Sequence, residues 1–152
     1  MHWFTSDLRV HDNPALAEAG RVGAVAGVFV RNPALLARHA GAPRRIAFMY
    51  ACLHALDATL RARDSRLVVV EGDPAVEVPR LAAALGARIV SHASNHEPAA
   101  RAREARVARA LTRDGVTVRA AEAALVQRPG TLTTGSGGLY PVSYTHLRAQ
   151  ET

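Results

Sequence analysis

The sequence predicts an α/β fold, a Rossmann-like doubly wound five-stranded parallel sheet in the order 3-2-1-4-5 with helices on both faces. First, short apolar runs alternate with longer segments of helical periodicity along the chain. Second, a capping residue stands before a helix-opening proline at Asn13-Pro14 and Asp73-Pro74. Third, strands and helices alternate along the chain, which implies right-handed crossovers between parallel strands. The length of 152 residues suits a single domain of this kind.

The expected strands are short and apolar, as in a sheet covered on both faces. A polar, glycine-containing or proline-containing segment ends most of them. The five strands are expected around Trp3-Phe4 and over residues 23–30, 67–70, 87–90 and 116–118.

Four helices are expected between these strands. The first begins at Pro14, and residues 43–63 form the second, with one apolar stripe. A third follows Asp73-Pro74, where Pro79 predicts one loose turn and a restart, because proline removes an interior hydrogen bond. The fourth runs from Pro98 to about residue 114. The stripe of the second helix consists of Ile46, Met49, Leu53, Leu56 and Leu60.

Composition excludes several classes of enzyme. All 19 basic residues are arginine, so neither a lysine Schiff base nor the lysine of a phosphate-binding P-loop can form. The formal charge of +6 leaves two interpretations open, a nucleic-acid footprint or arginines on solvated helix faces. The arginines are spread along the chain, which favours the second.

The single cysteine, Cys52, cannot form an internal disulfide, which agrees with a reducing compartment. No apolar run approaches the length of a membrane span. We therefore expect a cytoplasmic, monomeric protein without a membrane partner.

Polar residues follow the first and fourth strands, whose carboxyl ends meet where the strand order reverses. Residues 5–9 are therefore expected near His96, Glu97 and Arg101, in a crevice where Asp7 and Arg9 could orient an aromatic ligand. A structural alternative is equally open: Asp7 or Asp12 braces the loop against Arg9. No nucleophile–base set and no metal-ligand spacing can be assembled, so the residues predict a binding domain.

Glu97 also has a structural alternative. It precedes Pro98 at the start of a helix, where the helix dipole stabilises a carboxylate without any ligand.

The segment WFTSDLRVHDNPAL (residues 3–16) resembles the opening of the DNA photolyase/cryptochrome family. Further matches are Arg44-Arg45 with Phe48, LVVVEGDP (residues 67–74) and HEPAARARE (residues 96–104). The resemblance implies the N-terminal α/β domain of a light-driven enzyme that repairs pyrimidine dimers in DNA. It further implies that FAD and damaged DNA bind a C-terminal helical domain, which is the partner of this one.

In that family the α/β domain can hold an antenna chromophore, which passes excitation to FAD. By resemblance the antenna site would use Thr5, Ser6, Asp7, Arg9, Glu97 and Arg101.

Two departures bear on the chromophore. Thr5-Ser6 replaces the commoner Arg-Arg, and Ala99-Ala100 stands where folate-binding members carry Asn-Glu. A deazaflavin-type antenna is therefore preferred over a folate, and an empty site is the alternative.

The predicted organisation has three parts. Residues 1–126 form the α/β domain, and the glycine- and threonine-rich residues 127–142 connect to the missing helical FAD domain. Because the family resemblance breaks at Ser143, residues 143–152 are expected to be a non-native tail, and the chain alone to be inactive. Two alternatives remain, a cryptochrome-type photoreceptor domain without repair activity and an unrelated nucleotide-binding α/β module.

Overall fold

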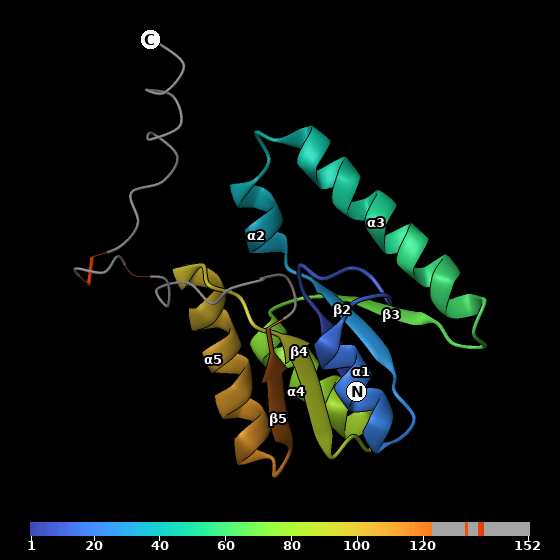
Figure 1. The fold of residues 1–152 in the computed structure, drawn as a ribbon. Coiled ribbons are helices and arrows are strands. Elements are labelled where there is room, and N and C mark those ends of the chain that lie inside the picture. Colours follow the sequence, from blue (N-terminus) through green and yellow to red (C-terminus); the bar gives the residue numbers. More distant parts are fainter. Residues whose placement is uncertain (123–132, 134–136, 139–152) are drawn as a thin grey trace.

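The computed structural model describes residues 1–122, 133, 137 and 138. Its centre is a parallel sheet of five strands in the order β3-β2-β1-β4-β5, which confirms the predicted fold class (Figure 1). Every strand pair is parallel, so the carboxyl ends of all five strands lie at one edge of the sheet. The strands are β1 (His2–Phe4), β2 (Gly27–Arg31), β3 (Leu67–Glu71), β4 (Ile89–Ala93) and β5 (Thr117–Ala121).

Each helix in the described part of the chain begins at a proline. This position suits proline because the first helical N–H has no partner inside the helix and the fixed φ angle is already helical. Sequence analysis missed one helix, α2, in which the Asn32 side chain accepts hydrogen bonds from the N–H groups of Ala34 and Leu35. The helices are α1 (Pro14–Val22), α2 (Pro33–Arg38), α3 (Pro43–Arg61), α4 (Pro74–Ala84) and α5 (Pro98–Arg113).

Helix α2 was missed for a physical reason. It has six residues, none of them buried, so no apolar stripe marks it in the sequence. Asn32-Pro33 was interpreted only as the end of a strand, whereas it also caps this short helix.

Alternate residues of the strands supply two separate cores. Trp3, Val28 and Val90 pack with α4 and α5 on one face. Phe4 and Phe29 pack with α3 on the other. Since successive side chains of a strand point to opposite faces, this division follows from the two-residue period of β1 and β2.

The predicted break at Pro79 is wrong, because α4 is continuous from Pro74 to Ala84. Pro79 is the sixth helical residue, so its missing N–H removes a single bond, to the carbonyl of Ala75. The helix buries Val78 and Leu81 in the core formed with α5, and this packing outweighs the loss.

The apolar stripe of α3 is buried over only part of its length. Leu53, Leu56 and Leu60 are in the core, but Ile46 and Met49 are half-buried. Figure 1 shows the reason: the amino-terminal half of α3 stands clear of the sheet, and Phe48 there is 72% exposed.

The predicted connector and tail, residues 127–142 and 143–152, lie outside the described residues except for 133, 137 and 138. Among the described residues, none of the helices has the length and apolar character needed to cross a bilayer.

Candidate functional site

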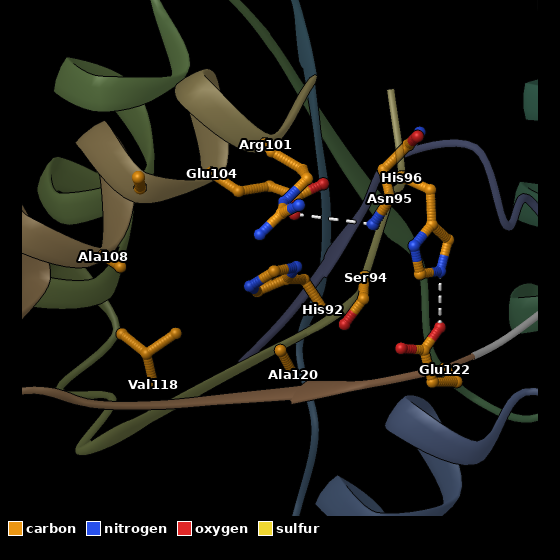
Figure 2. Close-up of a pocket in the computed structure, with 11 residues that line it drawn as sticks. His92, Ser94, Asn95, His96, Arg101, Glu104, Ala108, Val118, Ala120 and Glu122 are labelled. Atoms are coloured by element: carbon orange, nitrogen blue, oxygen red, sulfur yellow. Dashed lines mark hydrogen bonds and ion pairs between the residues drawn. The ribbon is translucent and has the colours of Figure 1, made fainter. Parts of the chain in front are cut away.

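A polar pocket of about 630 Å³ opens at the carboxyl ends of β4 and β5, beneath the first turns of α5 (Figure 2). Its volume is in the range of small-molecule sites. It lies beside β4 and β5 and has no lining residue from β1, so it is one strand away from the predicted crevice between β1 and β4, where the strand order reverses. The lining residues come from β4, the loop after it, α5 and β5. They are His92, Ser94, Asn95, His96, Arg101, Glu104, Ala105, Ala108, Val118, Ala120 and Glu122.

Local periodicity explains this set. Residues 101, 104, 105 and 108 share one face of α5 because of the three-and-four spacing of a helix. Residues 92 and 94, and likewise 118, 120 and 122, alternate along their strands and extensions toward the same face of the sheet. The alanines leave space between α5 and β5, so the pocket has an apolar end and a polar end (Figure 2).

Glu104 is the least satisfied group of the pocket. Its Oε2 accepts one long hydrogen bond, 3.4 Å, from the N–H of Asn95. Its Oε1 is buried and has no hydrogen-bond partner among the residues that the structure describes. Burial raises the pKa of Glu104 above its usual value, and the charges of His92, Arg103 and Arg101 oppose that rise only in part.

His92 forms the floor of the polar end and is only 4% exposed. Its Nδ1 lies 3.0 Å from the carbonyl oxygen of Ala93 and donates a hydrogen bond to it. The ring also contacts Trp3, with 5.5 Å between ring centroids. This packing holds the imidazole in place beneath Arg101 and Glu104 (Figure 2).

The mouth of the pocket is bounded by an ion pair. His96 Nε2 lies 2.8 Å from a carboxylate oxygen of Glu122, which joins the loop after β4 to the end of β5 (Figure 2).

Of the six predicted binding residues, only Arg101 lines this pocket. Asp7 is 2% exposed and its carboxylate is turned into its own loop. It accepts hydrogen bonds from the N–H of Thr5 at 3.0 Å and from the amide of Asn13 at 2.8 Å. His2 Nε2 lies 3.4 Å away.

These contacts decide the ionisation of Asp7. Burial alone would raise the pKa of Asp7, but the hydrogen bonds from His2, Thr5 and Asn13, with the charge of His2, bring it below its usual value. Asp7 is therefore a carboxylate that organises the loop after β1.

The other predicted residues lie around this loop or at the start of α5. Arg9 donates to the backbone oxygen of Asp12 at 2.8 and 3.2 Å, so the bracing interaction expected as an alternative is present. The Thr5 hydroxyl reaches Asp7 at 3.5 Å, and Ser6 is exposed. Glu97 occupies the N-cap position of α5, but its side chain makes no capping hydrogen bond.

A serine, a histidine and an aspartate do come together, contrary to the expectation that no such set could be assembled. Ser91 Oγ lies 2.9 Å from His2 Nδ1, and His2 Nε2 faces Asp7. Ser91 is only 2% exposed and sits within the central sheet, so no substrate can reach it. The contacts from Ser91 through His2 to Asp7 therefore form a structural network that joins β4, β1 and the loop after β1.

Sequence analysis missed His92 and Glu104 as site residues. For Glu104 a signal was available, because it shares a helical stripe with Ala100, Val107 and Leu111, which are all buried. A carboxylate in an apolar stripe is costly unless a partner compensates it. His92 carries no comparable signal.

Metal binding has no support in this region. Within the part of the chain that the structure describes, no group of three or more His, Cys, Asp or Glu side chains is placed to hold a metal ion.

Solved structures share this fold. A class III photolyase from Agrobacterium tumefaciens superposes with a TM-score of 0.81 and 31% identity, over 97% of this chain and 30% of that one. An archaeal photolyase from Sulfolobus tokodaii, solved with two FAD molecules, has a TM-score of 0.75 over 88% of this chain and 31% of that one. At 24% identity, the second shows the fold alone.

Sequence relatives agree with the structures. The chain is 45% identical to a deoxyribodipyrimidine photo-lyase from Streptomyces griseus over 113 residues, 74% of this chain. The chain is 34% identical to the deoxyribodipyrimidine photo-lyase from Synechococcus over 93% of this chain. This chain spans only 25% of the Streptomyces protein and 30% of the Synechococcus protein. The family model described as DNA photolyase matches residues 1–151. The chain therefore belongs to the DNA photolyase family.

Proposed function

We propose that this chain is the antenna-chromophore-binding domain of a deoxyribodipyrimidine photo-lyase, an enzyme that uses light and FAD to repair pyrimidine dimers in DNA. One observation carries the proposal. In a member of this family, a pocket of about 630 Å³ with an apolar and a polar end lies between α5 and the strands β4 and β5.

Binding is assigned to two groups of side chains. Arg101 lies in the pocket, where its planar guanidinium can stack on a ring or donate to a carbonyl. Thr5, Ser6, Asp7, Arg9 and Glu97 stay in the proposal as residues of the flanking loop and helix start. Among them Asp7 and Arg9 act by holding the loop after β1 in its folded shape.

The catalytic cofactor belongs elsewhere in this proposal. FAD and damaged DNA would bind a helical domain, and the chain by itself would be inactive in repair. The antenna is proposed to be of the deazaflavin type, because Ala99 and Ala100 offer no polar side chains to a folate.

A cryptochrome-type photoreceptor domain is the second candidate. The chain is 36% identical to cryptochrome-1 of Erithacus rubecula over 78% of its length, which matches its identity to some photo-lyases. The third alternative, an unrelated nucleotide-binding module, is excluded because the chain belongs to the photolyase family.

Reconstitution tests the antenna assignment. The full chain is incubated separately with a deazariboflavin, FMN and methenyltetrahydrofolate, and bound chromophore is measured by absorption after gel filtration. We expect a retained deazaflavin band. A folate band without a deazaflavin band would overturn the chromophore assignment, and a colourless protein in all three cases would overturn the binding function.

A chimera separates repair from photoreception. Here the chain replaces the matching region of the Streptomyces griseus photo-lyase, to which it is 45% identical. We expect photoreactivation of ultraviolet-irradiated cells that lack their own photolyase. A chimera that folds and binds FAD but does not restore survival would favour the cryptochrome alternative.

A further inference from the structure

Glu104 has an unused hydrogen-bonding atom in the pocket. Its Oε1 is buried and unpartnered among the described residues, while Oε2 has only the long bond from Asn95. A buried polar atom left without a partner destabilises a fold by about 1–3 kcal/mol. Such an atom in a ligand-sized pocket suggests that the missing partner is a ligand.

The groups around Glu104 suit it to a ligand that donates a hydrogen bond. Burial raises the pKa of Glu104, and His92, Arg103 and Arg101 oppose this rise. His96 and Glu122 pair with each other at the mouth of the pocket. As a carboxylate, Glu104 can only accept, so Oε1 would take a hydrogen bond from a ligand N–H.

The rest of the pocket restricts the ligand further. Ala108 and Val118 line the end away from Glu104, so an apolar ring system fits there (Figure 2). Arg101 stands beside Glu104 and is a donor only. A ligand edge with an N–H next to a carbonyl complements this pair.

We propose that Glu104 and Arg101 together recognise the imide edge of the chromophore: Glu104 Oε1 accepts from the imide N–H, and Arg101 donates to a flanking carbonyl. This inference rests on the proposed antenna function and makes it more specific. The ligand class is a fused heterocycle with a pyrimidinedione ring, which deazaflavins and flavins share. The fused rings would lie between α5 and β5.

An imide-methylated probe tests the hydrogen bond. Deazariboflavin and its imide N-methyl derivative are titrated against the full chain, and the dissociation constants are measured by fluorescence. A hydrogen bond to a charged group predicts roughly 10- to 100-fold tighter binding of the unmethylated probe. In Glu104→Ala, the affinity for the unmethylated probe is expected to fall to that for the methylated probe. The affinity for the methylated probe should not change.

Two further variants complete the experiment. Glu104→Gln keeps a carbonyl acceptor, so it should retain part of the preference for the unmethylated probe. Glu71→Gln makes the same change on β3, the outer strand on the other side of the sheet from β5, and should bind as the unmodified chain does. Circular dichroism verifies that each variant is folded.

The outcomes separate the two levels of the proposal. If the unmodified chain binds both probes equally, or if Glu104→Ala keeps the preference, the role of Glu104 is wrong and the antenna function stands. If the unmodified chain binds neither probe and no flavin, both fail.

Discussion

Two carboxylates of this domain have opposite environments, although both lie near the carboxyl edge of one sheet. Asp7, in the loop after β1, has hydrogen bonds from Thr5 and Asn13 and lies beside His2, and its pKa is lowered. Glu104, on α5, has one long hydrogen bond and a raised pKa. A carboxylate with a complete set of partners holds the fold together, whereas one without them is available to a ligand.

The segment with the family motif and the pocket are in different places. Residues 3–16 carry the clearest family signature and many polar groups, yet several of these groups bind one another. The pocket lies across β4, where fewer polar residues remain incompletely paired.

Removing Asp7 should have the largest effect. Asp7→Ala removes the acceptor of the hydrogen bonds from the N–H of Thr5 and the amide of Asn13, and it removes the carboxylate that lies 3.4 Å from His2 Nε2. We expect a loss of about 3–5 kcal/mol in the free energy of unfolding, measured by urea denaturation. Asp12→Ala is the control, because its side chain is 92% exposed, and it should change stability by less than about 1 kcal/mol. Equal effects of the two variants would contradict the structural role of Asp7.

A comparison of two asparagine caps tests whether the hydrogen bond to Asp7 adds to the stability of the fold. Asn13 and Asn32 both cap helices, but only Asn13 is buried and also donates to Asp7. Asn32→Ala should destabilise by about 1 kcal/mol, the usual value for a cap, and Asn13→Ala by about 2 kcal/mol or more. Similar losses in denaturant titrations would show that the link to Asp7 adds nothing to the cap.

Glu104→Leu should increase the free energy of unfolding, whereas the substitutions at Asp7 and Asn13 should lower it. It removes an incompletely paired carboxylate from the apolar stripe of α5, so the free chain should become more stable by about 1 kcal/mol. The same variant should lose chromophore binding. A destabilised variant would indicate that Glu104 contributes to the fold, as Asp7 does.

The pH dependence of stability should also differ between the two sites. The pKa of Asp7 is below its ordinary value of 3.8, so its contribution is present above that value and is lost as pH falls through the folded pKa. The pKa of Glu104 is above its ordinary value of 4.5, so its penalty is present at neutral pH and disappears as pH falls toward 4.5.

Urea titrations of the unmodified chain and Glu104→Gln between pH 7 and pH 4 measure how the stability penalty of Glu104 depends on pH. The variant should be the more stable at pH 7, and the difference should shrink on acidification. A difference that grows as pH falls would mean that the pKa of Glu104 is lowered instead.

Much of the fold could be predicted because its signals are local. Proline after a capping residue marks the helix starts at Pro14 and Pro74, and β-branched runs mark β2 and β3. Where a signal depends on packing, prediction was weaker: Pro79 lies inside a continuous helix, and α2 carries no buried residue.

The site was predicted only in part for the same reason. Arg101 was named and lines the pocket, whereas His92 and Glu104 were not. Whether a carboxylate is satisfied depends on the direction of side chains and on burial, which the sequence pattern does not give. Asp7 turns into its own loop and bonds Thr5 and Asn13, whereas Glu104 turns toward β4 and the loop after it and receives one long hydrogen bond.

The sequence by itself determined the strand order and the family, because periodicity, caps and motif spacing depend on neighbouring residues. Only the tertiary structure decided which polar residues serve the fold and which face the pocket. Hydrogen-bond satisfaction is a property of three-dimensional neighbours: Asp7 has its partners within the loop, whereas Glu104 Oε1 has none among the described residues.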